Sequence, residues 1–274
     1  MSLHPAVQPG AVAVITGAAS GIGLAAAQAF AVMGLKIALV DLPGEKLEAA
    51  ARALGGRAFP ADVSDLAQVQ ALEAQVRAAL GPVAVLMNNA GIQPGSAIFG
   101  AQENWERVIS VNLWGVIHGA RTFLPGMIAK GAPGLVINTG SKQGITTPPG
   151  DPAYNVAKAG VKAFTEALQH ELRNTAGCAV TAHLLIPGFV YTALTKGSRT
   201  EKPSGAWTPE QTVTFMLESL GKGDFYILCP DNDVPRKLDE RRIAWAAGDI
   251  IENRPPLSRW HKDHTAGFAA FLKR

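Results

Sequence analysis

The sequence predicts an α/β fold, a single-domain Rossmann-type, doubly wound parallel sheet with helices on both faces. Short apolar runs alternate with longer stretches of helical period along most of the 274-residue chain. These apolar runs are continuous instead of alternating with polar residues, which is typical of parallel strands buried on both faces. No linker or internal repeat interrupts the alternation, so we expect residues 1–274 to form one domain.

Each expected strand is a short apolar run that ends at a turn signal, and each expected helix has an amphipathic or apolar helical period. We expect strands at residues 11–16, 36–40, 57–61, 83–87, 134–139, 179–185 and 225–229, with helices at 21–33, 46–54, 66–80, 103–129, 153–175 and 207–220. Residues 193–220 are expected to form a loop and helix over the substrate, and residues 231–274 a C-terminal tail extension.

Composition narrows the class of protein. With 47% hydrophobic and 17% charged residues the chain can bury a sizeable core, which argues against disorder. The net charge of +3 comes without a Lys/Arg run, so we expect no nucleic-acid partner. Cys178 and Cys229 form no paired motif, no metal-ligand spacing occurs, and no apolar stretch is long enough for a membrane span. These features favour a cytoplasmic protein without a metal site or a membrane partner.

A glycine loop directly follows the first expected strand. Its glycines at 17, 21 and 23 allow a tight turn and a close approach of the backbone to a pyrophosphate, at the positive end of the next helix. Asp41 ends the second strand, where a carboxylate accepts hydrogen bonds from ribose hydroxyls and repels a 2′-phosphate. The cofactor expected is therefore NAD and not NADP.

Tyr154 and Lys158 stand four residues apart at the start of an expected helix, so their side chains share one face about 5–6 Å apart at Cβ. A neighbouring ammonium stabilises a phenolate, which is expected to lower the pKa of Tyr154 and make it an acid/base near neutral pH. Ser141 follows the fifth strand, and its hydroxyl can hydrogen-bond a reacting oxygen. Asn112 lies inside the long expected helix at 103–129.

These motifs, with the Asn-Asn-Ala-Gly segment at residues 88–91 and Pro187-Gly188, resemble the short-chain dehydrogenase/reductase family from about residue 11 to residue 192. The resemblance implies a Ser141–Tyr154–Lys158 triad in which Tyr154 exchanges the alcohol proton, Lys158 tunes it, and Ser141 orients the substrate oxygen. It implies that Asn112 holds a water that links Lys158 to solvent. The cofactor-binding residues that it implies are Gly17, Ser20, Gly21, Ile22, Gly23, Asp41, Asp62, Val63, Asn89, Ala90, Gly91, Tyr154, Lys158, Pro187, Gly188, Val190 and Thr192, and Asn88 is expected beside them.

The substrate pocket is expected to be mainly apolar, which favours a hydrophobic or aromatic secondary alcohol. Its expected residues are Gln93, Ser141, Gln143, Tyr154, Phe189 and Trp207, with Ile92, Ile145 and Tyr191 beside them. The chain lacks the Asp-Gly-Gly ending common in bacterial family members, and we expect the tail to pack over the active-site mouth or across a subunit interface. The resemblance implies a homodimer or homotetramer, with the dimer formed by the two long helices.

Three alternatives remain open at this point. The first is an NADPH-dependent ketone reductase, against which Asp41 argues. The second is a dehydratase or epimerase that retains NAD, although the signatures for sugar nucleotides are absent. The third is a non-catalytic dinucleotide-sensing protein, which predicts damage at Tyr154, Lys158 or Ser141, and none is seen.

Overall fold

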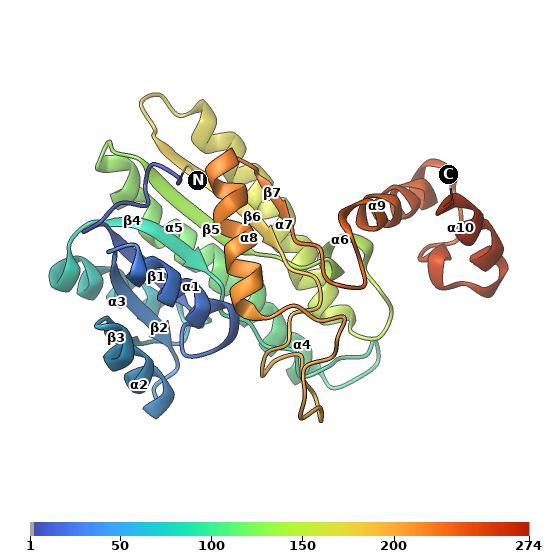
Figure 1. The fold of residues 1–274 in the computed structure, drawn as a ribbon, viewed down its shortest axis with the longest axis horizontal. Helices are drawn as coiled ribbons and strands as arrows, with labels where there is room; N and C mark the ends of the chain where they lie inside the picture. The colour runs from blue at the N-terminus through green and yellow to red at the C-terminus, as the bar shows by residue number, and fades with distance from the viewer. Residues whose placement is uncertain (1–2, 274) are drawn as a thin grey trace.

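The computed structural model describes residues 3–273 and confirms the predicted fold class. Seven parallel strands form one sheet in the order β3-β2-β1-β4-β5-β6-β7 (Figure 1). They are β1 (Val12–Thr16), β2 (Lys36–Asp41), β3 (Arg57–Pro60), β4 (Val83–Asn88), β5 (Gly134–Thr139), β6 (Val180–Ile186) and β7 (Tyr226–Leu228). The order reverses between β1 and β4, and in open α/β sheets such a switch point is where ligands bind.

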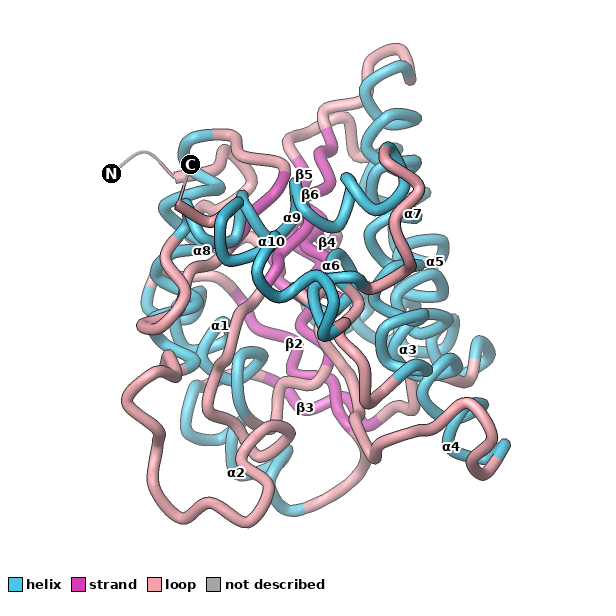
Figure 2. Tube along the Cα trace, turned by 90° about the vertical axis from the view of Figure 1, so that its right-hand side faces the viewer, coloured by secondary structure: helices cyan, strands magenta, loops and turns pink. Residues whose placement is uncertain are grey.

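Helices cover both faces of the sheet. They are α1 (Gly21–Val32), α2 (Glu45–Leu54), α3 (Leu66–Leu80), α4 (Gln102–Ile109), α5 (Gly115–Ala129), α6 (Gln143–Thr146), α7 (Pro152–Asn174) and α8 (Pro209–Lys222). Figure 2 shows the sheet edge-on, with α1 and α8 on one side and α3, α5 and α7 on the other. Alternate residues of β1 face opposite layers, because Ala13 and Ile15 pack in the α1/α8 core and Val12 and Val14 in the α3/α5/α7 core.

The expected helix at 103–129 is wrong in detail. It consists of α4 and α5 joined by a π-helical turn, η1 (Ser110–Trp114). A π-turn adds one residue to a helix without breaking it, and such turns occur frequently at functional sites. The helix expected from Trp207 begins instead at Pro209, because Thr208 accepts a hydrogen bond from the Gln211 backbone and the Gln211 side chain binds the Thr208 backbone in return.

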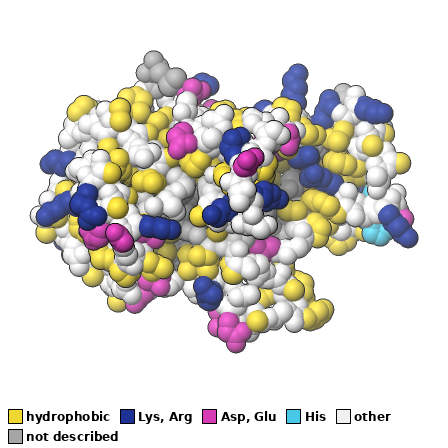
Figure 3. All heavy atoms as spheres, turned by 60° about the horizontal axis from the view of Figure 1, so that its bottom comes forward, with side chains coloured by type: hydrophobic (Ala, Val, Ile, Leu, Met, Phe, Trp, Pro, Cys, Tyr) yellow, Lys and Arg dark blue, Asp and Glu magenta, His cyan; other side chains and the backbone are white. Residues whose placement is uncertain are grey.

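The C-terminal tail continues into α9 (Arg236–Ile251), η2 (Ser258–Trp260), η3 (Lys262–His264) and α10 (Thr265–Phe271). Beyond the start of α9 it extends away from the sheet, on the right in Figure 1. It has a small cluster of its own, in which Trp245 contacts Phe268, Phe271 and the Arg254 guanidinium, and Trp245 Nε1 donates to Ser258 Oγ at 2.8 Å. Figure 3 shows Lys and Arg side chains scattered over this projecting part.

The helices described between residues 3 and 273 include none with both the length and the apolar character needed to cross a bilayer.

Candidate active site

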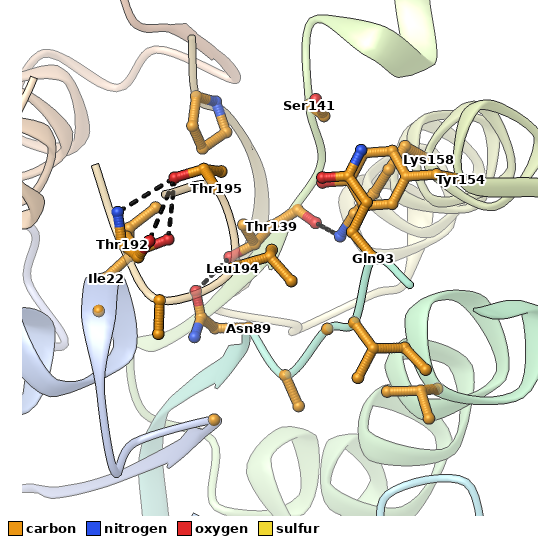
Figure 4. A pocket seen from close by; sticks show the side chains of 18 of the residues that line it. Ile22, Asn89, Gln93, Thr139, Ser141, Tyr154, Lys158, Thr192, Leu194 and Thr195 are labelled. Atoms are coloured by element: carbon orange, nitrogen blue, oxygen red, sulfur yellow. Dashed lines mark hydrogen bonds between the residues drawn. The ribbon is translucent and has the colours of Figure 1, made fainter. Parts of the chain in front are cut away.

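A cavity of about 880 Å³ opens at the carboxyl ends of the strands around the switch point. This volume lies toward the upper end for sites that take a small molecule or cofactor. Figure 4 shows side chains entering it from the glycine loop, the segment after β4, the start of α7 and the loop after β6. The ends of β1, β2, β4, β5 and β6 all contribute to its wall, so motifs far apart in the sequence share one site.

The glycine loop forms one wall, to which Gly17, Ser20, Gly21 and Ile22 contribute. Gly17 has a φ of +67°, and a Cβ on it would lie 2.9 Å from Ala90 Cα, so a side chain is excluded there on both counts. The start of α1 presents free backbone N–H groups and the positive end of its dipole to the cavity. This bare backbone cradle fits a pyrophosphate.

Asp41 stands at the end of β2 in the same wall. Its Oδ2 accepts a hydrogen bond from the Ala19 backbone at 3.0 Å and its Oδ1 one from the Leu42 backbone at 2.8 Å. The carboxylate is thereby fixed in orientation, while each oxygen keeps a lone pair for a further donor. Asp62 and Val63 also line the cavity, and their role in binding the cofactor stays a prediction.

Partly buried hydrogen bonds hold the segment after β4 against the glycine loop. Thr16 Oγ1 accepts from the backbone N–H groups of Asn89 and Ala90, at 2.9 and 3.1 Å. The Asn89 amide donates to Thr16 O at 3.1 Å and accepts from Thr139 Oγ1 at 3.3 Å. The ends of β1, β4 and β5 are therefore locked together, which fixes the floor of the cavity at Asn89, Ala90 and Gly91.

Ser141, Tyr154 and Lys158 meet at the inner end of the cavity (Figure 4). Ser141 Oγ accepts a hydrogen bond from the Gln143 backbone at 3.1 Å, which leaves its own proton available for donation. Lys158 Nζ lies 5.7 Å from the centre of the Tyr154 ring and donates to Thr139 O at 2.7 Å. Both Tyr154 and Lys158 are buried, at 8% and 3% exposure.

Burial dominates the titration of this pair. It raises the pKa of Tyr154 to about 12, although a hydrogen bond with the Ser141 side chain acts in the opposite direction. Burial also lowers the pKa of Lys158 to about 8. The expectation of a lowered pKa for Tyr154 is therefore wrong for this state of the protein, because the cost of desolvating a phenolate dominates and the charge of Asp151 adds to it. Tyr154 is a protonated donor here.

Asn112 lies in the η1 turn with a fully buried side chain, outside the cavity lining. Its Oδ1 accepts from Ile92 N and its Nδ2 donates to Ile92 O, both at 2.8 Å. The Asn112 side chain thus ties the segment after β4 to η1, which packs against α7. The water relay from Asn112 to Lys158 stays a prediction.

The loop after β6 closes the cavity over the glycine loop. Pro187, Gly188, Phe189, Val190 and Thr192 line it, and the contacts expected of them with cofactor and substrate stay predictions. Thr195 Oγ1 donates to Val190 O and accepts from Thr192 N at 3.1 Å, which folds the loop back on itself. A Cβ on Gly21 would meet Thr192 Cγ2 at 3.3 Å, so the loop lies directly over the start of α1.

Several expected site residues support the cavity without lining it. Gly23 packs under the loop, where a Cβ would lie 2.3 Å from Gly17 O. Asn88 is buried, and its amide donates to Asn138 Oδ1 at 2.9 Å. Trp207 lies outside the lining, where its indole packs on Phe215 and donates to Asn232 Oδ1, and its contact with a substrate stays a prediction. Ile145 and Tyr191 are also absent from the lining, whereas Gln93, Gln143 and Ile92 are part of it.

Other lining residues were missed. They include a helix face on α4 and η1, a polar position after β3, and the end of the closing loop: Glu106, Arg107, Ser110, Val111, Ser64, Ala193, Leu194 and Thr195. Helical spacing could have indicated the first group, since Glu106 and Ser110 are four apart and Arg107 and Val111 are as well. The closing loop carries no periodic signal.

Comparison with known proteins identifies the family. Residues 11–203 match the family described as short chain dehydrogenase. The chain is 30% identical to 1-deoxy-11-beta-hydroxypentalenate dehydrogenase from Streptomyces exfoliatus, over 90% of this chain and 93% of that relative. The fold and the match together show that the chain belongs to the short-chain dehydrogenase family. It is therefore an oxidoreductase of a family that binds a nicotinamide dinucleotide.

Two solved structures are similar along most of the chain. A short-chain dehydrogenase/reductase from Burkholderia phymatum in complex with NAD superposes with a TM-score of 0.82 at 32% identity, covering 90% of this chain and 96% of the other. L-Sorbose reductase from Gluconobacter frateurii, complexed with NADPH and L-sorbose, gives 0.71 at 28% identity, covering 82% and 94%. The two neighbours hold different dinucleotides, so similarity alone does not choose between them.

Proposed function

We propose that this protein transfers a hydride between NAD(H) and a secondary alcohol or ketone, with Tyr154 as the acid/base. The observation that carries the proposal is that one cavity holds Ser141, Tyr154 and Lys158 together with the carboxylate of Asp41. Asp41 ends β2 and Ser141 follows β5. These two strands lie three strand spacings apart in the sheet, or roughly 14 Å. Such a separation suits a dinucleotide laid across the strand ends, with the glycine loop beneath its pyrophosphate.

The residues at the inner end divide the proton chemistry among them. In ketone reduction the buried, protonated Tyr154 donates its proton to the carbonyl oxygen, and in alcohol oxidation its phenolate removes the hydroxyl proton. Ser141 donates its proton to the same oxygen, because the hydrogen bond that its oxygen accepts from the Gln143 backbone leaves the O–H free to donate. The nicotinamide ring, when bound, supplies or accepts the hydride. Lys158 supplies a cation that favours the phenolate while the proton is away.

The preference for NAD(H) rests on Asp41. Two backbone hydrogen bonds fix its carboxylate in the cavity wall, so it cannot swing away from a 2′-phosphate. A ribose with two free hydroxyls donates to such a carboxylate, whereas a phosphate there adds like charge at close range. Binding of NADP(H) would then require a cation beside the 2′-phosphate to offset the negative charge of Asp41.

The proposed substrate is a hydrophobic or aromatic secondary alcohol. Around the reacting end, Ile92, Phe189 and Leu194 give apolar surface, and the amides of Gln93 and Gln143 provide a small number of polar contacts. A pocket of this kind binds an apolar body with one oriented oxygen. The dehydrogenase from Streptomyces exfoliatus is named for a hydroxylated carboxylate and the L-sorbose reductase for a sugar, so polyols belong in the test.

The decisive experiment combines cofactor titration with turnover. NADH and NADPH are titrated separately against the protein, followed by nicotinamide fluorescence, and NAD⁺ is then supplied with 1-phenylethanol, 2-octanol and galactitol. We expect tighter binding of NADH and turnover of the first two alcohols. Tyr154→Phe should lose turnover and keep NADH binding. Tyr191→Phe is the matched control, since that hydroxyl bonds Arg199 O outside the cavity lining. Turnover that survives in Tyr154→Phe refutes the mechanism.

We also propose that the protein is cytoplasmic and forms a homodimer, or a homotetramer that contains it, through the face of α5 and α7. Exposed apolar side chains support this choice of face, with Trp114 at 47% and Val156 at 51% exposure. Trp114 stacks on His118 at 5.7 Å, so it is held in place on that surface. Light scattering should give a dimer or tetramer for the wild type and a smaller species for Trp114→Glu.

A further inference from the structure

Lys142 directly follows Ser141 and is unlike an ordinary loop lysine. Its side chain is only 17% exposed, and its Nζ lies 2.6 Å from Asp239 Oδ2 and 3.3 Å from Asp231 Oδ2. Both carboxylates are themselves almost wholly buried, at 5% and 6% exposure. Buried ion pairs of this kind constrain geometry, because breaking one leaves an uncompensated charge.

The same cluster touches the loop after β6. Asp231 Oδ2, which pairs with Lys142, also accepts a hydrogen bond from Phe189 N at 3.2 Å. A Cβ on Gly188 would lie 2.5 Å from Asp231 Oδ2 and 2.8 Å from Lys142 Nζ, so only glycine lets the pair pack this closely. The Lys142 backbone N–H donates to Pro187 O at 3.3 Å. One ion cluster therefore joins the Ser141 loop to the segment Pro187–Phe189.

The third member of the cluster comes from the tail. Asp239 lies in the first turn of α9, the point at which the tail leaves the body of the protein. The charged groups that face it are Lys142 from the Ser141 loop, Asp231 from the segment between β7 and α9, Arg242 from α9 and Arg259 from η2. The thiol of Cys229 also lies within reach of Lys142 and Asp239. Cationic side chains therefore approach Asp239 from two directions, Lys142 from the active-site loop and Arg242 and Arg259 from the tail.

The backbone of Lys142 also stabilises α6, the short helix that begins at Gln143. The backbone N–H groups of Ile145 and Thr146 donate to Lys142 O at 3.1 Å, and Gly144 N donates to Ser141 O at 3.0 Å. The Gln143 N–H that orients the Ser141 hydroxyl lies in this same turn. Displacing Lys142 therefore displaces the donor that sets the direction of the Ser141 proton.

We propose that Asp239 and Asp231 act through Lys142 as positioning residues for Ser141, so that the first turn of the tail helix α9 is a working part of the active site. This role differs from the two that the sequence leads us to expect of the tail, a cover over the cavity mouth and a subunit contact. This inference rests on the proposed function for its kinetic consequence. Its structural consequence, the order of residues 141–146, is independent of any substrate.

The test compares Asp239→Asn with Asp249→Asn. Asp239→Asn removes the charge that faces Lys142 and leaves the Lys142–Asp231 pair. Asp249→Asn is the matched control, because Asp249 is also a tail carboxylate with a side chain only 11% exposed, but its partners, Arg254 and Ser258, both lie within the tail. Hydrogen exchange by mass spectrometry follows the amides of residues 141–146 in each variant. Turnover of the best alcohol in the panel and NADH binding are measured on the same samples.

We expect Asp239→Asn to speed exchange at residues 143–146 and to lower kcat by roughly tenfold or more, since a displacement of about 1 Å at a reacting group can cost 100-fold. KM and NADH binding should change little. Asp249→Asn should loosen residues of the tail alone. Lys142→Met should reproduce the effect of Asp239→Asn, and the double variant should be no worse than Lys142→Met, because both changes break one linkage.

Two results overturn the inference. One is unchanged exchange at residues 143–146 in Asp239→Asn, and the other is an equal loss of kcat in Asp239→Asn and Asp249→Asn, which would show that only the integrity of the tail matters. If the wild type turns over no alcohol, the proposed function fails, and the exchange comparison still decides this inference.

Discussion

Burial of Lys158 gives a prediction that needs no substrate. Burial lowers the pKa of Lys158 from 10.5 to about 8, which corresponds to roughly 3 kcal/mol of destabilisation when the amine is charged in the folded protein. Below pH 8 the lysine is protonated in both the folded and unfolded states, and this cost is present in full. Between pH 8 and 10.5 the unfolded chain binds the proton more tightly, so the free energy of unfolding rises with pH.

The perturbation is Lys158→Met, which removes this titration. From about pH 7 to about pH 9.5, the wild type should gain roughly 2 kcal/mol of unfolding free energy relative to Lys158→Met. Urea unfolding at the two pH values measures it, and all other titrating groups cancel in the difference. Lys162→Met, one turn along α7 at a half-exposed position paired with Glu166, should follow the wild type. A Lys158→Met curve parallel to that of the wild type refutes the burial argument.

Three further variants test other parts of the site. Ser141→Ala should lower kcat about 100-fold and leave the NADH dissociation constant within about twofold, since its hydroxyl serves only the reacting oxygen; steady-state kinetics measure this, and a fall in KM alone contradicts it. Asp41→Asn should narrow the ratio of NADH to NADPH affinity by about tenfold or more, because a fixed negative charge is removed from the ribose site; an unchanged ratio in fluorescence titrations argues against its role. Gly144→Ala should cost about 1–3 kcal/mol of stability in urea unfolding, because its Cβ would lie 2.4 Å from the Lys158 backbone carbon; a wild-type midpoint would show that α6 can move.

The sheet could be predicted because its signal is local. The run Val83–Asn88 is buried along its whole length, and each predicted strand ends within a residue or two of where the sequence indicates. The π-turn at Ser110–Trp114 could not be predicted in this way, since one added residue changes the helical period too little to be seen. The helix Gln143–Thr146 is a single turn, which is too short to show any period.

The site was predictable to the extent that its motifs have fixed spacing. The glycine loop, Asp41 and the Tyr154–Lys158 pair line one cavity, because a doubly wound sheet brings every strand end to the same edge. Trp207 lies outside the cavity lining, because closeness in sequence to the loop after β6 does not set the direction of a side chain. The direction of the pKa shift of Tyr154 was missed for a related reason, since the sequence does not show the burial that raises it.

The two lysines beside Ser141 show what spacing alone leaves open. Both are largely buried, and both lie in the wall of the same cavity. Lys158 donates to a neutral carbonyl, Thr139 O, so nothing of opposite charge offsets its desolvation, and its pKa falls to a range where a proton can leave. Lys142 contacts two carboxylates, one of which comes from a helix 97 residues further along the chain. The environment of Lys158 favours loss of its proton, whereas the two carboxylates around Lys142 hold that side chain in place. The sequence places lysine at both positions, and only the fold assigns them these different environments.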